Sequence, residues 1–283
     1  MRKKLILTLG AALLSLSLLA QGTVSTKKYR LSDFSDKQTM VVLGGNEFIS
    51  STLRQEVSSN WTASAFEFCT PEQFEARKTD PRYDFLLTVD TQFKGEEAPS
   101  LSCLCLLKGG PEAAEGLSAM QEVISLPLSG ADGGTGRELV YMGALVRSIQ
   151  EYVQAAMESE RVAMSPESWF NEKYGKWGRM RKICLAREDL APSVSDKELE
   201  KFLDEDFILA DADEVDATYL QGDYNTLVSY VVAPAQPEKG SWCYKMLIEA
   251  DTHSIYYLSR HKISDKKGVG FLPEDLKKLA RKR

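Results

Sequence analysis

The alternation of apolar and polar positions predicts strands and helices in turn along the first part of the chain. Residues 39–43, 63–68 and 83–89 are short β-rich runs, and the segments between them carry apolar residues at helical spacing. Thr70 and Gln73 have the spacing of a capping box, with a proline at the first helical position between them. The order is therefore β-α-β-α-β, which favours a parallel sheet with helices packed on it.

The alternation of strands and helices stops after residue 89. Residues 101–107 form the next β-rich run with only a turn-rich loop before it, so we expect this strand to pair antiparallel with its predecessor. Residues 122–128 predict another strand. A glycine-rich loop then leads into a long amphipathic helix over residues 137–160.

The pattern of predicted elements changes near residue 165. Ser165 and Ser195 each begin a predicted helix, the first aromatic and basic, and Pro273 begins a last one. Between them lie three stretches of strand character that read as an antiparallel meander, at residues 219–232, 242–250 and 254–263. No internal repeat is visible in the sequence.

These elements predict an α/β to α+β fold. An N-terminal β-α-β-α-β mixed sheet with packed helices is followed by a helical segment and a C-terminal antiparallel meander. We expect a signal peptide over residues 1–22, an α/β domain over residues 23–162 and an α+β domain over residues 163–283.

The first 22 residues have the pattern of a secretory signal peptide. Arg2, Lys3 and Lys4 precede a short apolar stretch, and small residues allow cleavage near Ala20 to Gly22. An uncleaved N-terminal anchor is the alternative reading. No later stretch has the run of apolar residues that a membrane span needs, so we expect a soluble periplasmic or extracellular protein without a transmembrane segment in the mature chain.

The charge and the cysteines narrow the possible functions. The formal net charge is −6, and loss of the basic leader makes it more negative, so we expect no nucleic-acid partner. Five cysteines remain in the mature chain, and an odd number leaves at least one thiol unpaired in an oxidising compartment. Cys103 and Cys105 lie two apart on a predicted strand, too far apart to form a disulfide with each other.

The loop before the long helix is the candidate ligand-binding site. A glycine loop at the start of a helix presents backbone N–H groups that attract anions, and the residues concerned are Gly133, Gly134, Thr135 and Gly136. The lysine of a phosphate-binding P-loop is absent, because Arg137 stands there. Thr135 and Glu138 also have capping-box spacing, so a purely structural role is the alternative.

The aromatic and basic helix is the candidate partner surface. In an acidic protein its local excess of positive charge beside aromatic rings suits an acidic partner, and the residues concerned are Trp169, Lys173, Lys176, Trp177 and Arg179. Aromatic residues at helical spacing also occur in protein cores, which is the alternative reading.

The remaining candidate chemistry is sparse. His253 and His261 have no ligand spacing around them, so no metal site is predicted. The acidic run over residues 204–216 lacks the glycine and the final glutamate of a calcium-binding EF-hand loop, and reads as a solvated loop.

We therefore expect a non-catalytic binding or assembly protein of the cell envelope. Its partner would be another envelope protein or a small ligand, and no cofactor is predicted. Two alternatives remain open: an extracytoplasmic hydrolase with a site near His253 or His261, and a thiol-dependent redox protein.

Overall fold

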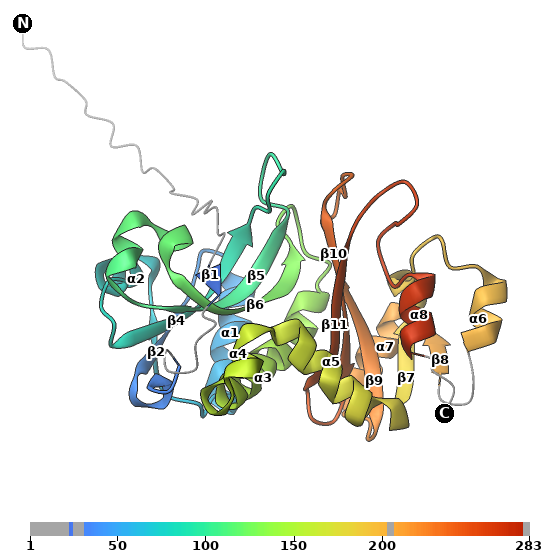
Figure 1. Cartoon of the computed structure of the whole chain (residues 1–283), viewed down its shortest axis with the longest axis horizontal. Helices are drawn as coiled ribbons and strands as arrows, with labels where there is room; N and C mark the ends of the chain where they lie inside the picture. The colour runs from blue at the N-terminus through green and yellow to red at the C-terminus, as the bar shows by residue number, and fades with distance from the viewer. Residues whose placement is uncertain (1–22, 25–30, 203–206, 280–283) are drawn as a thin grey trace, which may run out of the picture.

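The computed structural model describes residues 23–24, 31–202 and 207–279. The chain forms two mixed sheets with helices packed on them, which confirms the predicted α/β to α+β class. The first sheet lies on the left of Figure 1 and the second on the right. The predicted signal peptide lies outside the described residues. Among the helices that are described, none is long and apolar enough to cross a membrane.

The first sheet has six strands in the order β1-β6-β5-β4-β2-β3. The strands are β1 (Thr23–Val24), β2 (Gln38–Val42), β3 (Ala65–Cys69), β4 (Tyr83–Thr91), β5 (Leu101–Lys108) and β6 (Gln121–Gly130). β2 pairs parallel with both β3 and β4, whereas β4, β5 and β6 pair antiparallel. The predicted change of strand direction after β4 is thereby confirmed.

Local capping signals place the helices of the first half, which are α1 (Glu47–Asn60), α2 (Pro71–Arg77) and α3 (Arg137–Glu158). The side chain of Asn46 accepts a hydrogen bond from the backbone of Ile49 and begins α1. Thr70 and Gln73 form the predicted reciprocal capping box at α2. α3 packs against α1 and contacts strands of both sheets, so it connects the two halves.

Two helices lead from the first half to the second, α4 (Glu160–Met164) and α5 (Pro166–Lys176). α5 lies along the outer edge of β11 (Ile255–Lys262). There the Asn171 amide donates to the carbonyl of Leu258 at 2.9 Å and accepts from its N–H at 3.1 Å. This side chain satisfies backbone groups of an edge strand that would otherwise be open to pairing.

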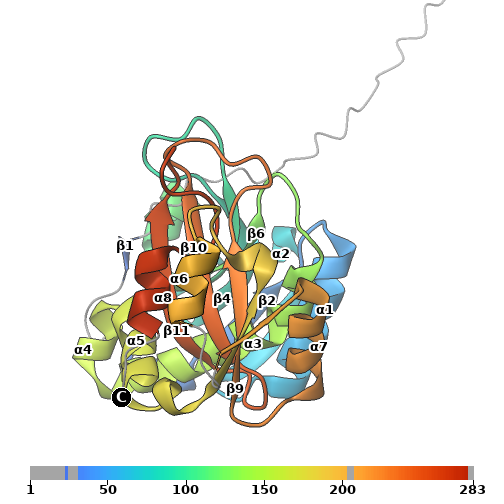
Figure 2. The same ribbon diagram turned by 90° about the vertical axis from the view of Figure 1, so that its right-hand side faces the viewer.

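The second sheet has five strands in the order β11-β10-β9-β7-β8. Its other strands are β7 (Lys182–Ala186), β8 (Phe207–Ala210), β9 (Thr226–Val232) and β10 (Trp242–Glu249), and its helices are α6 (Asp196–Phe202), α7 (Ala212–Gln221) and α8 (Pro273–Leu279). α6 and α8 cover the face turned away from the first half, in front of the strands in Figure 2. α7 packs against β7, β9 and α3. Short 3-10 helices occupy Phe34–Asp36, Pro111–Glu115, Leu117–Ala119, Gly178–Met180 and Arg187–Asp189.

The two halves repeat one topology, which the sequence does not reveal. In each half a first strand pairs parallel with a second and a third, and the third begins an antiparallel meander of three strands. β2, β3, β4, β5 and β6 thus correspond to β7, β8, β9, β10 and β11, and α1, α2 and α3 correspond to α6, α7 and α8. The chain is a tandem repeat of a β-α-β-α-β-β-β-α unit.

The predicted meander over β9, β10 and β11 is correct, but it is only part of the second sheet. β7 and β8 are parallel strands in segments where no strand was predicted. The acidic residues 211–216, predicted as a loop, contain the N-cap and first turn of α7, and residues 219–221 are helical rather than strand. Strands of five and four residues are too short for apolar periodicity to separate them from helix.

The hydrophobic core is continuous through both halves. One cluster of buried side chains includes Leu145 on α3, Leu126 on β6 and Met246 on β10. The hydroxyl of Tyr230 donates to the carbonyl of Leu128 at 2.5 Å, across the junction between the sheets. The predicted domain boundary between residues 162 and 163 therefore stays a prediction. The strands of each sheet lie on one side of this boundary, but the buried core extends across it.

The first half buries a carboxyl group that has no hydrogen-bond partner in the described part of the chain. This group belongs to Asp84 on β4, which is fully buried. Burial raises the pKa of this carboxyl to about 6, against the attraction of Lys37 and Lys108 and with a smaller contribution from Asp33. The fold therefore favours the protonated form of Asp84.

Candidate functional site

A cavity of about 470 Å³ lies where the two halves meet. One wall is the loop from β6 into α3, and the other is formed by the segments that follow β7, β8 and β9. These three strands are parallel, so their carboxyl ends meet at one edge of the second sheet. Ligands of α/β proteins commonly bind at such an edge. We call this space, bounded by residues 129–138, 188–189, 212–216 and 230–235, the junction cavity.

The predicted glycine loop forms part of this cavity. Gly133, Gly134 and Thr135 line it, and Gly136 is the N-cap of α3. Gly136 has φ of 92°, in the left-handed region that favours glycine. The structure thus brings the predicted loop to a cavity, and whether the loop binds an anion stays a prediction.

The start of α3 already carries a negative charge. The carboxylate of Glu138 folds back and accepts the N–H of Gly136 at 2.9 Å. A Cβ at Gly134 would lie 1.9 Å from Oε1 of Glu138, so a larger residue there would displace the Glu138 carboxylate. The expected capping box is incomplete, because Thr135 Oγ1 accepts only the N–H of Arg137, at 3.4 Å. Glu138 therefore occupies the position where the helix terminus would otherwise attract an anion.

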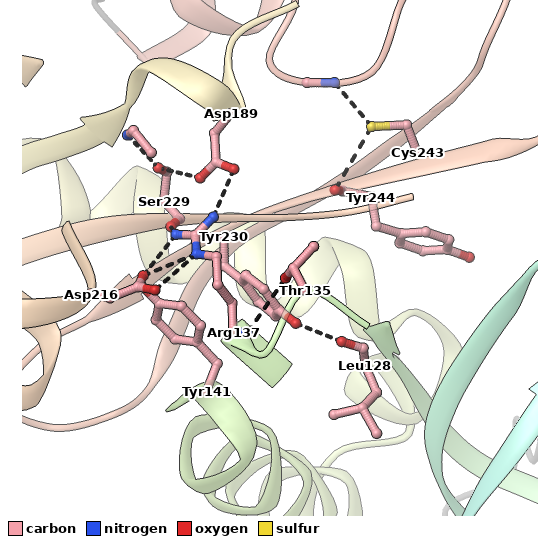
Figure 3. Close-up of polar contacts among 12 residues, drawn as sticks. Leu128, Thr135, Arg137, Tyr141, Asp189, Asp216, Ser229, Tyr230, Cys243 and Tyr244 are labelled. Carbon is pink, nitrogen blue, oxygen red and sulfur yellow. Dashed lines mark hydrogen bonds and ion pairs between the residues drawn. The ribbon is translucent and has the colours of Figure 1, made fainter. Parts of the chain in front are cut away.

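Arg137 joins the halves at the cavity (Figure 3). Its guanidinium binds the Asp216 carboxylate through Nε at 3.0 Å and Nη2 at 2.9 Å. Nη1 donates to Asp189 at 2.9 Å, and Nη2 also donates to the carbonyl of Ser229 at 3.1 Å. The Asp216 carboxylate also accepts the hydroxyl of Tyr141 at 2.7 Å. A residue of the first half is thus held by acids that follow β7 and β8 in the second.

Burial and charge act in opposite directions on this network. Burial lowers the pKa of Arg137, but the charges of Asp189 and Asp216 more than offset this, so its pKa is raised and it stays cationic. For Asp189, burial raises the pKa of the carboxyl, whereas the charge of Arg137 and the hydrogen bond from Ser229 lower it by a smaller amount. The guanidinium is committed to the junction and already faces two carboxylates, so it is a poor receptor for a further anion.

Acidic side chains outnumber basic ones around the junction cavity. Arg137 is the basic residue of its lining, and the acidic residues are Glu138, Glu188, Asp189, Asp213 and Asp216. Glu188 and Asp213 are exposed. A concave surface with this excess of negative charge concentrates cations rather than anions.

The predicted partner surface divides into an inner and an outer part. Trp169 packs against the rings of Tyr152 and Phe170, and Lys173 binds Glu151 at 2.9 Å, so both belong to the packed side of α5. Trp177 is 56% exposed and begins the outer part. Lys176 and Arg179 are exposed beside it. The core interpretation therefore describes the packed side of the segment, and the partner-surface interpretation describes its exposed side.

The two histidines do not share a site. His253 lies at the turn before β11 and His261 near its far end, roughly 27 Å apart along the strand at about 3.4 Å per residue. The ring of His253 packs on Tyr219 with centroids 4.6 Å apart, and a ring nitrogen of His261 bonds the carbonyl of Gly268 at 2.8 Å. Burial lowers the pKa of both side chains, so both rings are neutral at neutral pH.

The five cysteines are unpaired and buried. Burial raises the pKa of Cys69 and of Cys243 to about 11 and that of Cys103 to about 12. Burial also raises the pKa of Cys105 and Cys184. Because the thiolate is the reactive form, these environments oppose the nucleophilic chemistry that a thiol-dependent redox protein needs.

The ion pairs that hold the junction together were not predicted from the sequence. Asp189 and Asp216 lie far from Arg137 along the chain, and only folding brings them together. The available signal was Arg137 itself, a cation placed directly after a glycine loop.

No protein family model, no curated protein and no solved structure matches the chain. Within residues 31–202 and 207–279, no group of three acidic, histidine or cysteine side chains is arranged to hold a metal ion. The features of the molecule that bear on function are therefore the geometry and charge of the junction cavity.

Proposed function

We propose that the protein is an exported, non-catalytic binding protein of the cell envelope, and that the junction cavity binds an ammonium or guanidinium group. The ligand is a small cationic molecule or a basic side chain of a partner protein. The observation that carries this proposal is the excess of carboxylates around a cavity between two halves of one chain.

Size and position both support binding at this place. The cavity volume of about 470 Å³ falls within the range of small-molecule sites, ~300 to 1,000 Å³. Asp213 and Glu188 are the exposed acids of its lining, which leaves their carboxylates available to a ligand. Export follows from the leader sequence over residues 1–22, which is the part of the proposal that depends on sequence alone.

Calorimetric titration tests the charge preference directly. The purified mature protein is titrated with arginine amide, lysine amide and putrescine, and separately with phosphate and glutamate. We expect the cations to bind, with an affinity that falls as salt is added, and the anions to show no binding. Binding of phosphate or glutamate, or failure of all three cations to bind, would contradict the proposal.

Two substitutions locate the binding site. Asp213→Asn combined with Glu188→Gln removes the exposed negative charges and leaves the Arg137 network in place, so we expect the affinity for the cation to fall about tenfold. Glu97→Gln is the matched control, because Glu97 is an exposed acid in the loop between β4 and β5 and does not line the cavity. Equal loss of affinity in both proteins would exclude the junction cavity as the site.

A further inference from the structure

β8 is the outer strand of the second sheet. Its four residues pair in parallel with β7, from Phe207 opposite Ile183 to Ala210 opposite Ala186, and no other described strand pairs with it. Backbone groups on the outer side of such a strand are open to another strand. The opposite edge of the same sheet is covered by α5 through Asn171, so the two edges are treated differently.

The tandem repeat supplies an internal comparison, because β3 holds the same position in the first sheet. Phe66–Cys69 and Phe207–Ala210 share one pattern of exposure: partly buried, exposed, partly buried, buried. Within Phe66–Cys69 the exposed position is Glu67, whose carboxylate lies 3.3 Å from the Gln38 amide and 3.8 Å from the Arg77 guanidinium. Charged side chains of this kind protect edge strands against pairing.

β8 has no such protection on its own residues. Phe207, Ile208, Leu209 and Ala210 are all apolar, and Ile208, in the position of Glu67, is 46% exposed. Since the same topology accommodates a charge in the first half, the fold does not require an apolar residue here. Tyr224, which lines the same concavity as Ile208, is 85% exposed.

A concavity lies beside β8 on each face of the sheet. The one on the α6 side, about 400 Å³, is lined by Phe207 and Leu209. The one on the α7 side, about 370 Å³, is lined by Ile208 and Ala210. Successive side chains of an added strand point to opposite faces, so the two concavities suit its alternate residues.

The charges around β8 indicate the character of the partner. Four acidic and two basic side chains line the two concavities, namely Asp196, Glu200, Glu214 and Asp223 with Lys182 and Arg187. A segment with basic residues beside its apolar ones complements this surface, whereas an acidic segment is repelled.

We infer that β8 is a docking edge for an extended segment of a partner polypeptide, with apolar residues at alternate positions and basic residues at its ends. The segment adds a strand to the second sheet. Its backbone bonds the outer side of β8 and its side chains enter the two concavities. This surface is distinct from the junction cavity, so either proposal can fail alone.

The test uses a synthetic peptide of alternating valine and threonine with lysines at both ends. Two matched peptides carry glutamates at the ends, or a proline in place of the central valine. We expect the lysine peptide to bind the mature protein, the glutamate peptide to bind at least about tenfold more weakly, and the proline peptide not to bind, since proline cannot donate to a ladder. Equal binding of all three peptides, or binding of none, would overturn the inference.

Substitution of the edge provides the second measurement. Ile208→Lys places a charge on the docking edge at an exposed position, so we expect lost binding with an unchanged melting temperature. Ala65→Lys is the control on β3, and we expect full binding there. In hydrogen exchange, amides of β8 should slow when the lysine peptide binds while those of β3 do not. Binding that survives Ile208→Lys in the folded variant would refute docking at β8.

A second copy of the chain is the competing occupant of this edge. Sedimentation of the protein without peptide distinguishes the two, and we expect a monomer. A dimer that Ile208→Lys dissociates would show that β8 pairs with itself, which would overturn the proposal of a separate partner.

Discussion

Replacement of Arg137 by methionine tests whether the junction depends on a buried ion pair. The side chains of Arg137, Asp189 and Asp216 are 14%, 5% and 15% exposed. Methionine has comparable length and no charge, so it leaves two largely buried carboxylates without their cation. Removal of one partner from a buried pair commonly destabilises a protein by about 3 to 5 kcal/mol, and we expect a loss of that size.

Urea unfolding at neutral pH measures this loss as a change in the free energy of unfolding. Arg147→Met is the control on the same helix, because Arg147 is 45% exposed and pairs with Glu151 at 3.0 Å. Glu151 keeps its ion pair with Lys173 when Arg147 is removed, so we expect a loss of at most about 1 kcal/mol and a clear difference between the two variants.

A charge-balanced variant separates an unpaired charge from lost packing. When Arg137→Met is combined with Asp189→Asn and Asp216→Asn, neither carboxylate of this network is left without its cation, and we expect most of the lost stability to return. A loss below about 1 kcal/mol for Arg137→Met, or no recovery in the combined variant, would refute the view that Arg137 holds the halves together by charge.

Three further outcomes can be measured. The raised pKa of Asp84 stabilises the folded state below about pH 4, and this stabilisation, about 3 kcal/mol, is lost as the pH rises through 6. Asp84→Asn should therefore flatten the pH dependence of the free energy of unfolding, measured in urea, over that interval. An unchanged pH profile would contradict burial of this carboxyl group. Trp169→Ala should cost about 3 kcal/mol and Trp177→Ala less than about 1, by the same assay, because the first is packed and the second is 56% exposed; equal costs would contradict this difference in packing. The five buried thiols should react with a thiol reagent only after unfolding in guanidinium, and rapid labelling of the native protein would count against their burial.

Features that depend on neighbouring residues could be predicted from the sequence. The reciprocal bonds of Thr70 and Gln73 begin α2, and Ser195 and Glu198 form the same arrangement at α6. The 22 residues of α3 show helical periodicity over several turns, and its start at Arg137 was predicted correctly. Capping boxes and helical periodicity both relate residues that lie three or four positions apart, so they can be interpreted without knowledge of distant segments.

The construction of the second half depends on contacts between segments that are distant in the sequence. β7 and β8 contain five and four residues, and these short apolar runs become strands because the topology places them beside β9 and beside each other. The repeat of the first half is likewise a property of strand order, which the sequence does not display. Strand pairing joins residues far apart in the chain, so the preference of a short segment cannot specify it.

The candidate site shows most clearly the difference between local sequence signals and contacts that form only on folding. The glycines before α3 were found from the sequence, since glycine marks unusual backbone wherever it occurs in a loop. Their surroundings were not, because Asp189 and Asp216 reach Arg137 only when the second sheet packs against the first. Those carboxylates give the cavity beside the glycine loop an excess of negative charge. The sign of an electrostatic site depends on groups that are close in space, and here folding brings them together from distant parts of the sequence.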